Sequence, residues 1–141
     1  MTIALLTGAS GFIAGHVLKI LLKEGYTVKA TVRSKSKADY LKDLYHGDAK
    51  LSFEIVEDIG APGAFDEAVK GVDVIVHTAS PSNPVKDLLD PAIKGTKSIL
   101  QAAKNFAPQV KRIIITSSFA AILNWDKGEW PENTYSEVLK Y

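Results

Sequence analysis

The chain has 141 residues, of which 46% are apolar and 23% charged, and it contains no cysteine. This is the composition of an ordinary folded domain, because disordered chains hold fewer apolar residues and membrane proteins hold more. The lack of cysteine excludes a disulfide scaffold and a thiol nucleophile, and it favours a reducing compartment. Seventeen basic and 16 acidic residues give a net charge of +1, so the sequence offers no charge signal for nucleic-acid binding.

Neither apolar run of the sequence has the properties of a membrane segment. Residues 1–14 lack a positively charged start and are interrupted by Gly8 and Gly11, unlike a signal peptide. Residues 113–123 are too few to cross a bilayer. We therefore expect a cytoplasmic protein that does not bind a membrane. Separately, the sequence gives no reason to expect a metal site.

Strand and helix signals alternate along the chain, which is the pattern of a parallel sheet covered by helices on both faces. The predicted strands cover residues 3–7, 27–32, 51–56, 72–77 and 111–116. The predicted helices cover residues 12–24, 35–45, 64–69 and 88–106. The sequence thus predicts an α/β fold of the doubly wound, Rossmann type, ending after its fifth strand.

The first predicted helix has the clearest periodicity. Its apolar residues recur at helical spacing and predict one buried stripe, made of Phe12, Ile13, Val17, Ile20 and Leu21. A glycine at position 25 follows, where a helix C-cap prefers one.

The first chemical motif is the run Thr7-Gly8-Ala9-Ser10-Gly11-Phe12-Ile13-Ala14. Glycines make the tight turn out of the first strand and let the backbone approach a pyrophosphate, while the helix N-terminus favours the phosphate charge. A glycine-rich turn alone is weak evidence, but this one lies between a strand and an amphipathic helix. The motif therefore predicts a dinucleotide site at residues 8–13, with Ala14 in the place of a third glycine.

This spacing of glycines resembles the extended short-chain dehydrogenase/reductase family. Five further motifs resemble its branch of dihydroflavonol reductases and yeast NADPH-dependent carbonyl (methylglyoxal-type) reductases. They are Ala30-Thr31-Val32-Arg33-Ser34, Val56-Glu57-Asp58-Ile59, His77-Thr78-Ala79-Ser80-Pro81, Pro91-Ala92-Ile93-Lys94-Gly95-Thr96 and Ile115-Thr116-Ser117-Ser118. Because the motifs follow in order over nearly the whole chain, the resemblance implies an NADPH-dependent reductase acting on a small carbonyl substrate.

The end of the second strand predicts the choice of cofactor. Arg33 stands where NAD-binding proteins place an acid for the ribose 2′-hydroxyl, and its planar fork suits a 2′-phosphate. Lys37, further along the following helix, adds positive charge, whereas we expect Lys35 to be a solvated surface residue. No carboxylate occurs between Thr31 and Ser36, so we expect NADPH rather than NADH.

Two later segments complete the expected cofactor site. The resemblance implies that Asp58 accepts a hydrogen bond from the adenine amino group and that Ile59 packs on the ring. Residues 78–80 (Thr78, Ala79 and Ser80) follow the fourth strand at the edge where open α/β sheets bind ligands. His77 is expected to be a hydrogen-bonded core residue rather than a base.

The resemblance implies a catalytic role for Ser118, which would bind the carbonyl oxygen that receives the hydride, whereas Ser117 would contact cofactor or backbone. The family pairs this serine with a tyrosine followed four residues later by a lysine. None of the five tyrosines of this sequence has that lysine. We therefore expect residues 1–123 to be an incomplete NADP-binding domain, and residues 124–141 to be a surface segment leading to a catalytic helix and substrate lobe beyond the sequence. The alternative is a non-catalytic NADP(H)-binding or sensor module.

The fold type also predicts a self-association surface. With strand order 3-2-1-4-5, the last strand lies at the edge of the sheet and carries Ile113, Ile114 and Ile115. An apolar unpaired edge invites pairing, so a homodimer is an expected partner.

Overall fold

The structure is a computed structural model that describes residues 2–80 and 89–118. Its strands are β1 (Ile3–Thr7), β2 (Thr27–Val32), β3 (Leu51–Ile55), β4 (Val74–His77) and β5 (Arg112–Ile115). Its helices are α1 (Phe12–Lys23), α2 (Lys35–Leu44) and α3 (Leu89–Phe106). The predicted segment 124–141 lies outside the described residues. Within residues 2–80 and 89–118, no helix has both the length and the apolar character needed to cross a bilayer.

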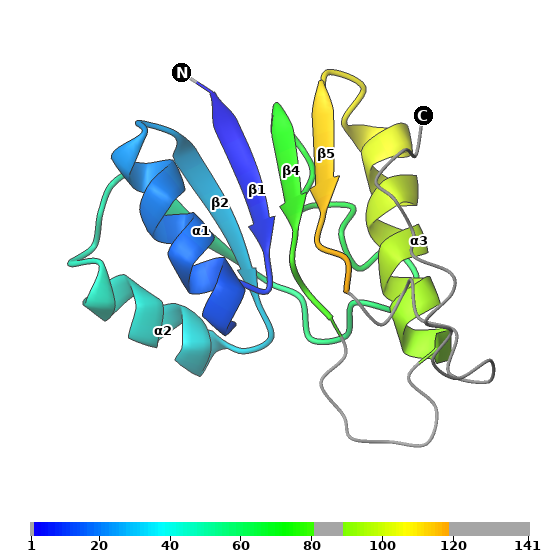
Figure 1. Cartoon of the computed structure of the whole chain (residues 1–141), viewed down its shortest axis with the longest axis horizontal. Coiled ribbons are helices and arrows are strands. Elements are labelled where there is room, and N and C mark those ends of the chain that lie inside the picture. Colours follow the sequence, from blue (N-terminus) through cyan, green and yellow to red (C-terminus); the bar gives the residue numbers. More distant parts are fainter. Residues whose placement is uncertain (1, 81–88, 119–141) are drawn as a thin grey trace, which may run out of the picture.

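The five strands form one parallel sheet in the order β3-β2-β1-β4-β5. Helices α1 and α2 lie on one side of it and α3 on the other (Figure 1). The expected Rossmann-type topology is confirmed. Because all strands run the same way, their carboxyl ends meet at one edge of the sheet.

The sheet separates two hydrophobic cores, because successive side chains of a strand point to opposite faces. On one face Leu5 packs with Phe65, Ile75 and residues of α3 such as Ile99. On the other face the next residue, Leu6, packs in the core that joins the sheet to α1 and α2. Strand β1 therefore contributes to both cores.

The buried face of α1 differs from the predicted stripe. Ala14 and Leu18 are buried, with Val17 and Leu21 half-buried beside them, whereas Phe12, Ile13 and Ile20 are exposed. Positions 14, 17, 18 and 21 recur at helical spacing, so the buried face is a neighbouring face of the helix, centred on Ala14 and Leu18. Gly25 adopts the expected left-handed conformation, with φ of 86°, and ends the helix. The amides of Gly25 and Tyr26 donate to Leu22 and Leu21 in the paired pattern of a Schellman motif.

The predicted helix over residues 64–69 is wrong. This segment is a series of turns. The amide of Asp66 donates to the Gly63 carbonyl and that of Val69 to the Phe65 carbonyl, so some backbone hydrogen bonds span three residues and others four. Isolated helices of this length are marginal, and Gly63, with φ of 71°, turns the chain just before it. Phe65 and Val69 are nevertheless fully buried, so the apolar pattern correctly indicated core residues.

Candidate dinucleotide-binding site

Three chain segments gather at the carboxyl edge of the sheet. The turn 8–11 follows β1, residues 78–80 follow β4 and residues 116–118 follow β5, and all three emerge at the lower edge in Figure 1. Ligands of open α/β sheets bind at this edge, beside the central strand where the strand order reverses. The structure thus brings the predicted glycine turn and the predicted residues 78–80 to one place.

The glycine turn is held tightly against two neighbouring strands. Gly8 has φ of 68°, and a Cβ atom placed on it would lie 2.9 Å from the Cα of Ala79. On the β2 side, the amide of Ala9 donates to the Thr31 carbonyl at 2.9 Å, and that of Gly8 to Thr31 Oγ1 at 3.2 Å. Only glycine fits position 8, because both the backbone conformation and the approach of Ala79 exclude a side chain.

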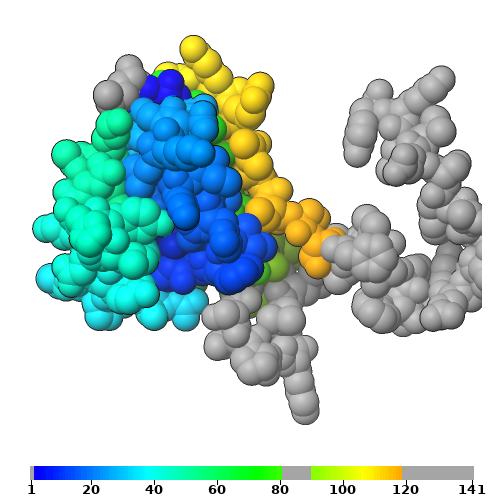
Figure 2. All heavy atoms as spheres, turned by 60° about the vertical axis from the view of Figure 1, so that its left-hand side comes forward, coloured from blue at the N-terminus to red at the C-terminus, as the bar shows by residue number. Residues whose placement is uncertain are grey.

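Helix α1 begins at this turn with an uncapped N-terminus. Gly11 is the N-cap residue, so no side chain satisfies the first amides, and the first turn carries no acidic residue. Ser10, Gly11, Phe12 and Ile13 are exposed, and the blue surface of α1 faces the viewer in Figure 2. Open backbone amides and the positive end of the helix dipole together favour an anion such as a phosphate.

A buried hydroxyl joins the ends of β1 and β4. Thr7 is fully buried, and its Oγ1 accepts hydrogen bonds from the amides of Thr78 at 3.2 Å and Ala79 at 3.1 Å. The Thr78 hydroxyl in turn donates to the Thr7 carbonyl at 2.5 Å. These bonds fix residues 78 and 79 beside the glycine turn.

His77 is buried in the same junction, as expected for a core histidine. It is 3% exposed, and its Nδ1 lies 2.8 Å from Thr7 Oγ1. Its ring is nearly perpendicular to that of Phe65, with 5.8 Å between the centroids. Burial lowers the pKa of His77 because the charged form loses hydration. The ring is therefore neutral at neutral pH.

The positively charged side of the site lies at the end of β2. Thr31 contacts the turn at Gly8 and Ala9, and Arg33, two residues later and just past the end of β2, is exposed. Lys37 is exposed on the first turn of α2. Lys35 forms an exposed ion pair with Asp39 at 2.7 Å, which agrees with the expectation that it is a surface residue.

Asp58 and Ile59 lie beyond the end of β3. The Oδ1 atom of Asp58 accepts a hydrogen bond from the Gly60 amide at 2.8 Å, which shapes the turn. Ile59 is half-buried and packs so closely on α3 that a Cβ atom on Gly95 would lie 2.8 Å from its Cδ1. These contacts tie Asp58 to the turn and Ile59 to α3.

Ser118 lies past the end of β5 and is exposed. Two residues before it, the amide and hydroxyl of Thr116 both contact the His77 carbonyl, at 3.1 and 3.3 Å. The segment that carries Ser118 is thus tied to the end of β4, which also carries residues 78–80.

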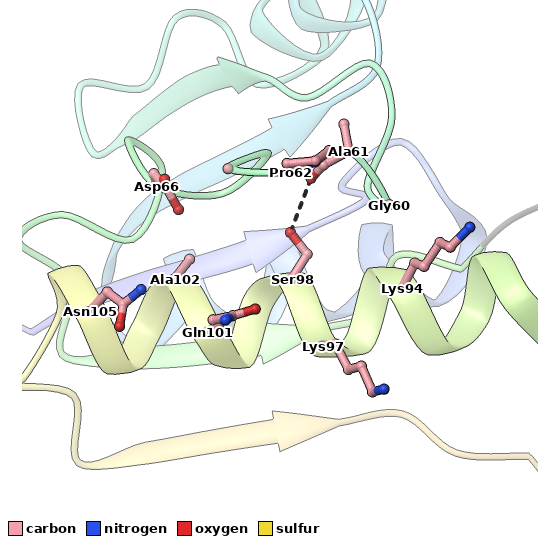
Figure 3. A pocket seen from close by; sticks show the side chains of 11 residues that line it. Gly60, Ala61, Pro62, Asp66, Lys94, Lys97, Ser98, Gln101, Ala102 and Asn105 are labelled. Carbon is pink, nitrogen blue, oxygen red and sulfur yellow. Dashed lines mark hydrogen bonds between the residues drawn. The ribbon is translucent and has the colours of Figure 1, made fainter.

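A hollow of about 420 Å³ lies elsewhere, between the turn after Ile59 and α3. In Figure 3, Ser98 points from α3 to the carbonyl of Ala61, 3.5 Å away. Lys94 reaches from the same helix toward this turn. None of the predicted cofactor or catalytic residues lines this hollow.

The structural roles of Thr7 and Thr31 were not predicted by the sequence patterns. Both are threonines at or near the ends of largely buried strands, and both are themselves buried, at 0% and 2% exposure. A polar residue in such a run must find a hydrogen-bond partner, which is the signal that could have identified them.

The chain matches known proteins over most of its length. A family model described as NAD(P)H-binding matches residues 8–141. The ketoreductase azaE of Aspergillus niger is 47% identical over 96% of this chain and 45% of its own length. The NADPH-dependent methylglyoxal reductase GRE2 of Saccharomyces cerevisiae is 38% identical over 93% of this chain and 41% of its own length.

Solved structures agree with these matches. Gre2 from Candida albicans, crystallised in complex with NADPH, has a TM-score of 0.83 and 44% identity, covering 87% of this chain and 39% of that one. The chain therefore spans less than half the length of these relatives. Its uncapped glycine turn, its strand order and the family match agree: the chain belongs to the NAD(P)H-binding family, and its relatives are reductases of the short-chain type that its motifs resemble.

Proposed function

We propose that this chain binds NADPH and forms the cofactor half of a carbonyl reductase. The glycine turn carries the proposal, because Gly8 leaves only enough room for backbone against Ala79 while α1 presents uncapped amides beside it. The relatives named as NADPH-dependent reductases support it. When bound, NADPH would supply a hydride to a carbonyl carbon, while the residues of this chain would hold and orient the reactants.

Each group of predicted residues would contact a different part of the cofactor. Residues 8–13 would hold the pyrophosphate, with the uncapped backbone amides at the start of α1 as donors. Arg33 and Lys37 would hold the 2′-phosphate, since β2 ends in a cation and no carboxylate follows it up to Ser36. Asp58 and Ile59 would contact the adenine, and residues 78–80 the nicotinamide ribose and diphosphate.

Ser118 is the proposed catalytic residue. Its hydroxyl would donate a hydrogen bond to the carbonyl oxygen of the substrate, where negative charge develops as the hydride arrives. The proton itself would need a donor with a pKa near neutrality, which the family supplies by a tyrosine and a lysine four residues apart. The 141 residues contain no such pair, so we expect this chain alone to bind NADPH without appreciable carbonyl reduction.

Calorimetric titration of the chain with NADPH tests the binding proposal. Saturable binding of one NADPH per chain supports it, whereas no heat of binding and no change in unfolding temperature would contradict it.

The catalytic proposal is tested in a protein that continues through a Tyr-x-x-x-Lys helix, by following NADPH oxidation with small carbonyls. Ser118→Ala should remove most of the rate and Ser117→Ala much less; equal effects would contradict the assignment.

We also propose that the edge strand β5 supports self-association. It is the last strand of the sheet, and Ile114 and Ile115 are exposed within the described part of the chain. Light scattering should show dimers or larger species of the 141-residue chain. A monomer that persists at high concentration would contradict this proposal.

A further inference from the structure

The imidazole ring of His77 reaches the candidate cofactor site through the side chain of Thr7. It is almost fully buried at the end of β4, where its Nδ1 lies 2.8 Å from Thr7 Oγ1. That hydroxyl oxygen also accepts the amides of Thr78 and Ala79. One oxygen therefore connects a buried imidazole to two backbone amides of the proposed cofactor site.

The hydrogen-bonding capacity of this oxygen decides the direction of each bond. A hydroxyl has one hydrogen to donate and two lone pairs to accept with. The amides of Thr78 and Ala79 use both lone pairs, so the hydrogen of Thr7 must point to His77. Nδ1 is then the acceptor, and the imidazole carries its single proton on Nε2. The lowering of the His77 pKa by burial agrees with a ring that remains neutral.

We propose that His77 is a positioning residue of the NADPH site, which orients the Thr7 hydroxyl so that it holds the amides of residues 78 and 79 beside the glycine turn. This inference rests on the proposed cofactor function. Position matters here because Ala79 approaches Gly8 as closely as backbone can, with 2.9 Å between its Cα and a Cβ placed on Gly8. A small movement of residue 79 would change the width of the space that the cofactor must enter.

The matched variants are His77→Asn and His77→Leu. Both side chains branch at the same carbon and remove the same outer ring atoms, but only asparagine can place an acceptor oxygen where Nδ1 stands. In His77→Leu the Thr7 hydroxyl loses its acceptor, and it must turn away from one of the two amides to find another. A role in packing alone would predict similar effects for the two variants.

The first measurement is amide hydrogen exchange in the chain without NADPH. In His77→Leu the amides of Thr78 and Ala79 should exchange at least about threefold faster than in wild type, and in His77→Asn they should stay within about twofold. The amide of Ala9 donates to Thr31 on the β2 side, so it serves as the internal reference: a loss of global stability would speed its exchange as well, and the increase at Thr78 and Ala79 must exceed that at Ala9. Equal exchange at residues 78 and 79 in both variants would overturn the proposal.

The second measurement is the dissociation constant of NADPH. We expect it to rise about three- to tenfold in His77→Leu and to be largely restored in His77→Asn. If wild type binds no NADPH, the cofactor proposal fails, while the exchange measurement still decides the part played by His77. If His77→Leu does not fold, nitrogen chemical shifts of the wild-type ring decide: a proton on Nε2 supports the proposal, and a proton on Nδ1 at neutral pH overturns it.

Discussion

The two sides of the candidate cofactor site are built in opposite ways. The junction of β1, β2 and β4 consists of short side chains, Thr7, Thr31 and His77, which are all buried and bonded to backbone or to one another. Past the end of β2, Arg33 and, on the first turn of α2, Lys37 are long, charged and exposed. The junction fixes the shape of the site, whereas the exposed cations determine which phosphate is attracted to it.

This difference separates two kinds of mutational effect. A change in the junction disturbs the backbone itself, so it should lower protein stability and the affinity for every dinucleotide together. A change at the exposed cations removes charge without moving the backbone, so it should alter the preference between NADPH and NADH at constant stability.

Gly8→Ala should give the largest effect. The new methyl group would clash with Ala79, and the alanine would have to adopt φ of 68°, which is unfavourable for any residue with a side chain. We therefore expect the unfolding free energy to fall by about 2–4 kcal/mol and NADPH binding to be lost. Urea denaturation and calorimetry measure the two effects.

Gly15→Ala is the matched control for that experiment. It lies one turn into α1, and a Cβ atom there has nothing within 4 Å. We expect it to gain about 0.5–1 kcal/mol, because alanine favours the helix. Equal destabilisation by the two variants would contradict the special role of Gly8.

Arg33→Asp should reverse the cofactor preference. The aspartate would repel a 2′-phosphate and could accept from a ribose hydroxyl, and loss of a charged contact worth about 1.5–3 kcal/mol weakens NADPH binding at least tenfold. Titrations with NADPH and NADH measure the ratio. Lys35→Ala, which removes only an exposed ion pair with Asp39, should leave that ratio unchanged. An unchanged preference in Arg33→Asp would show that the phosphate binds elsewhere.

The buried junction should also make stability depend on pH. Because burial lowers the pKa of His77 in the folded chain, the unfolded chain binds more protons below about pH 6.5. The contribution of His77 is complete above this pH and is lost as the pH falls through the lower folded pKa. Urea denaturation at a series of pH values should show this loss, and His77→Asn should reduce it. A wild type and variant with the same pH dependence would contradict the assignment.

The smallest effect is expected at the end of α2, away from both sides of the site. His46 has φ of 52°, and the amides of His46 and Gly47 close the helix on the carbonyls of Asp43 and Lys42. His46→Gly should therefore raise the unfolding free energy by about 0.5–1 kcal/mol, since glycine adopts this conformation without steric cost. Gly47→Ala, at φ of 65° with nothing near its Cβ position, should lower it. Thermal unfolding compares them, and a loss in His46→Gly would contradict the strain argument.

Sequence patterns predicted the strands because each is a short run rich in apolar or β-branched residues. They failed at residues 64–69, where burial of Phe65 and Val69 is compatible with turns as well as with a helix. They also misplaced the buried face of α1, since Phe12 is apolar but 85% exposed. Periodicity records which residues are apolar, whereas burial depends on where the helix meets the sheet.

The glycine turn could be predicted, because the requirement for glycine depends on backbone geometry close in the sequence. The link from His77 through Thr7 to residues 78 and 79 could not, since its partners are about 70 positions apart. Such a bond exists only once β1 and β4 are paired in register, with Thr7 opposite His77.

The contribution of β1 to both cores has a consequence for how the molecule unfolds. Leu5 and Leu6 anchor opposite layers, while the same strand pairs with β2 on one edge and β4 on the other. If either helical layer detaches, β1 loses the packing on one of its two faces, so neither half of the sheet can fold as an independent unit. We therefore expect one cooperative transition, in which the amides of the glycine turn that bond to Thr31 become exchangeable mainly when the whole chain opens.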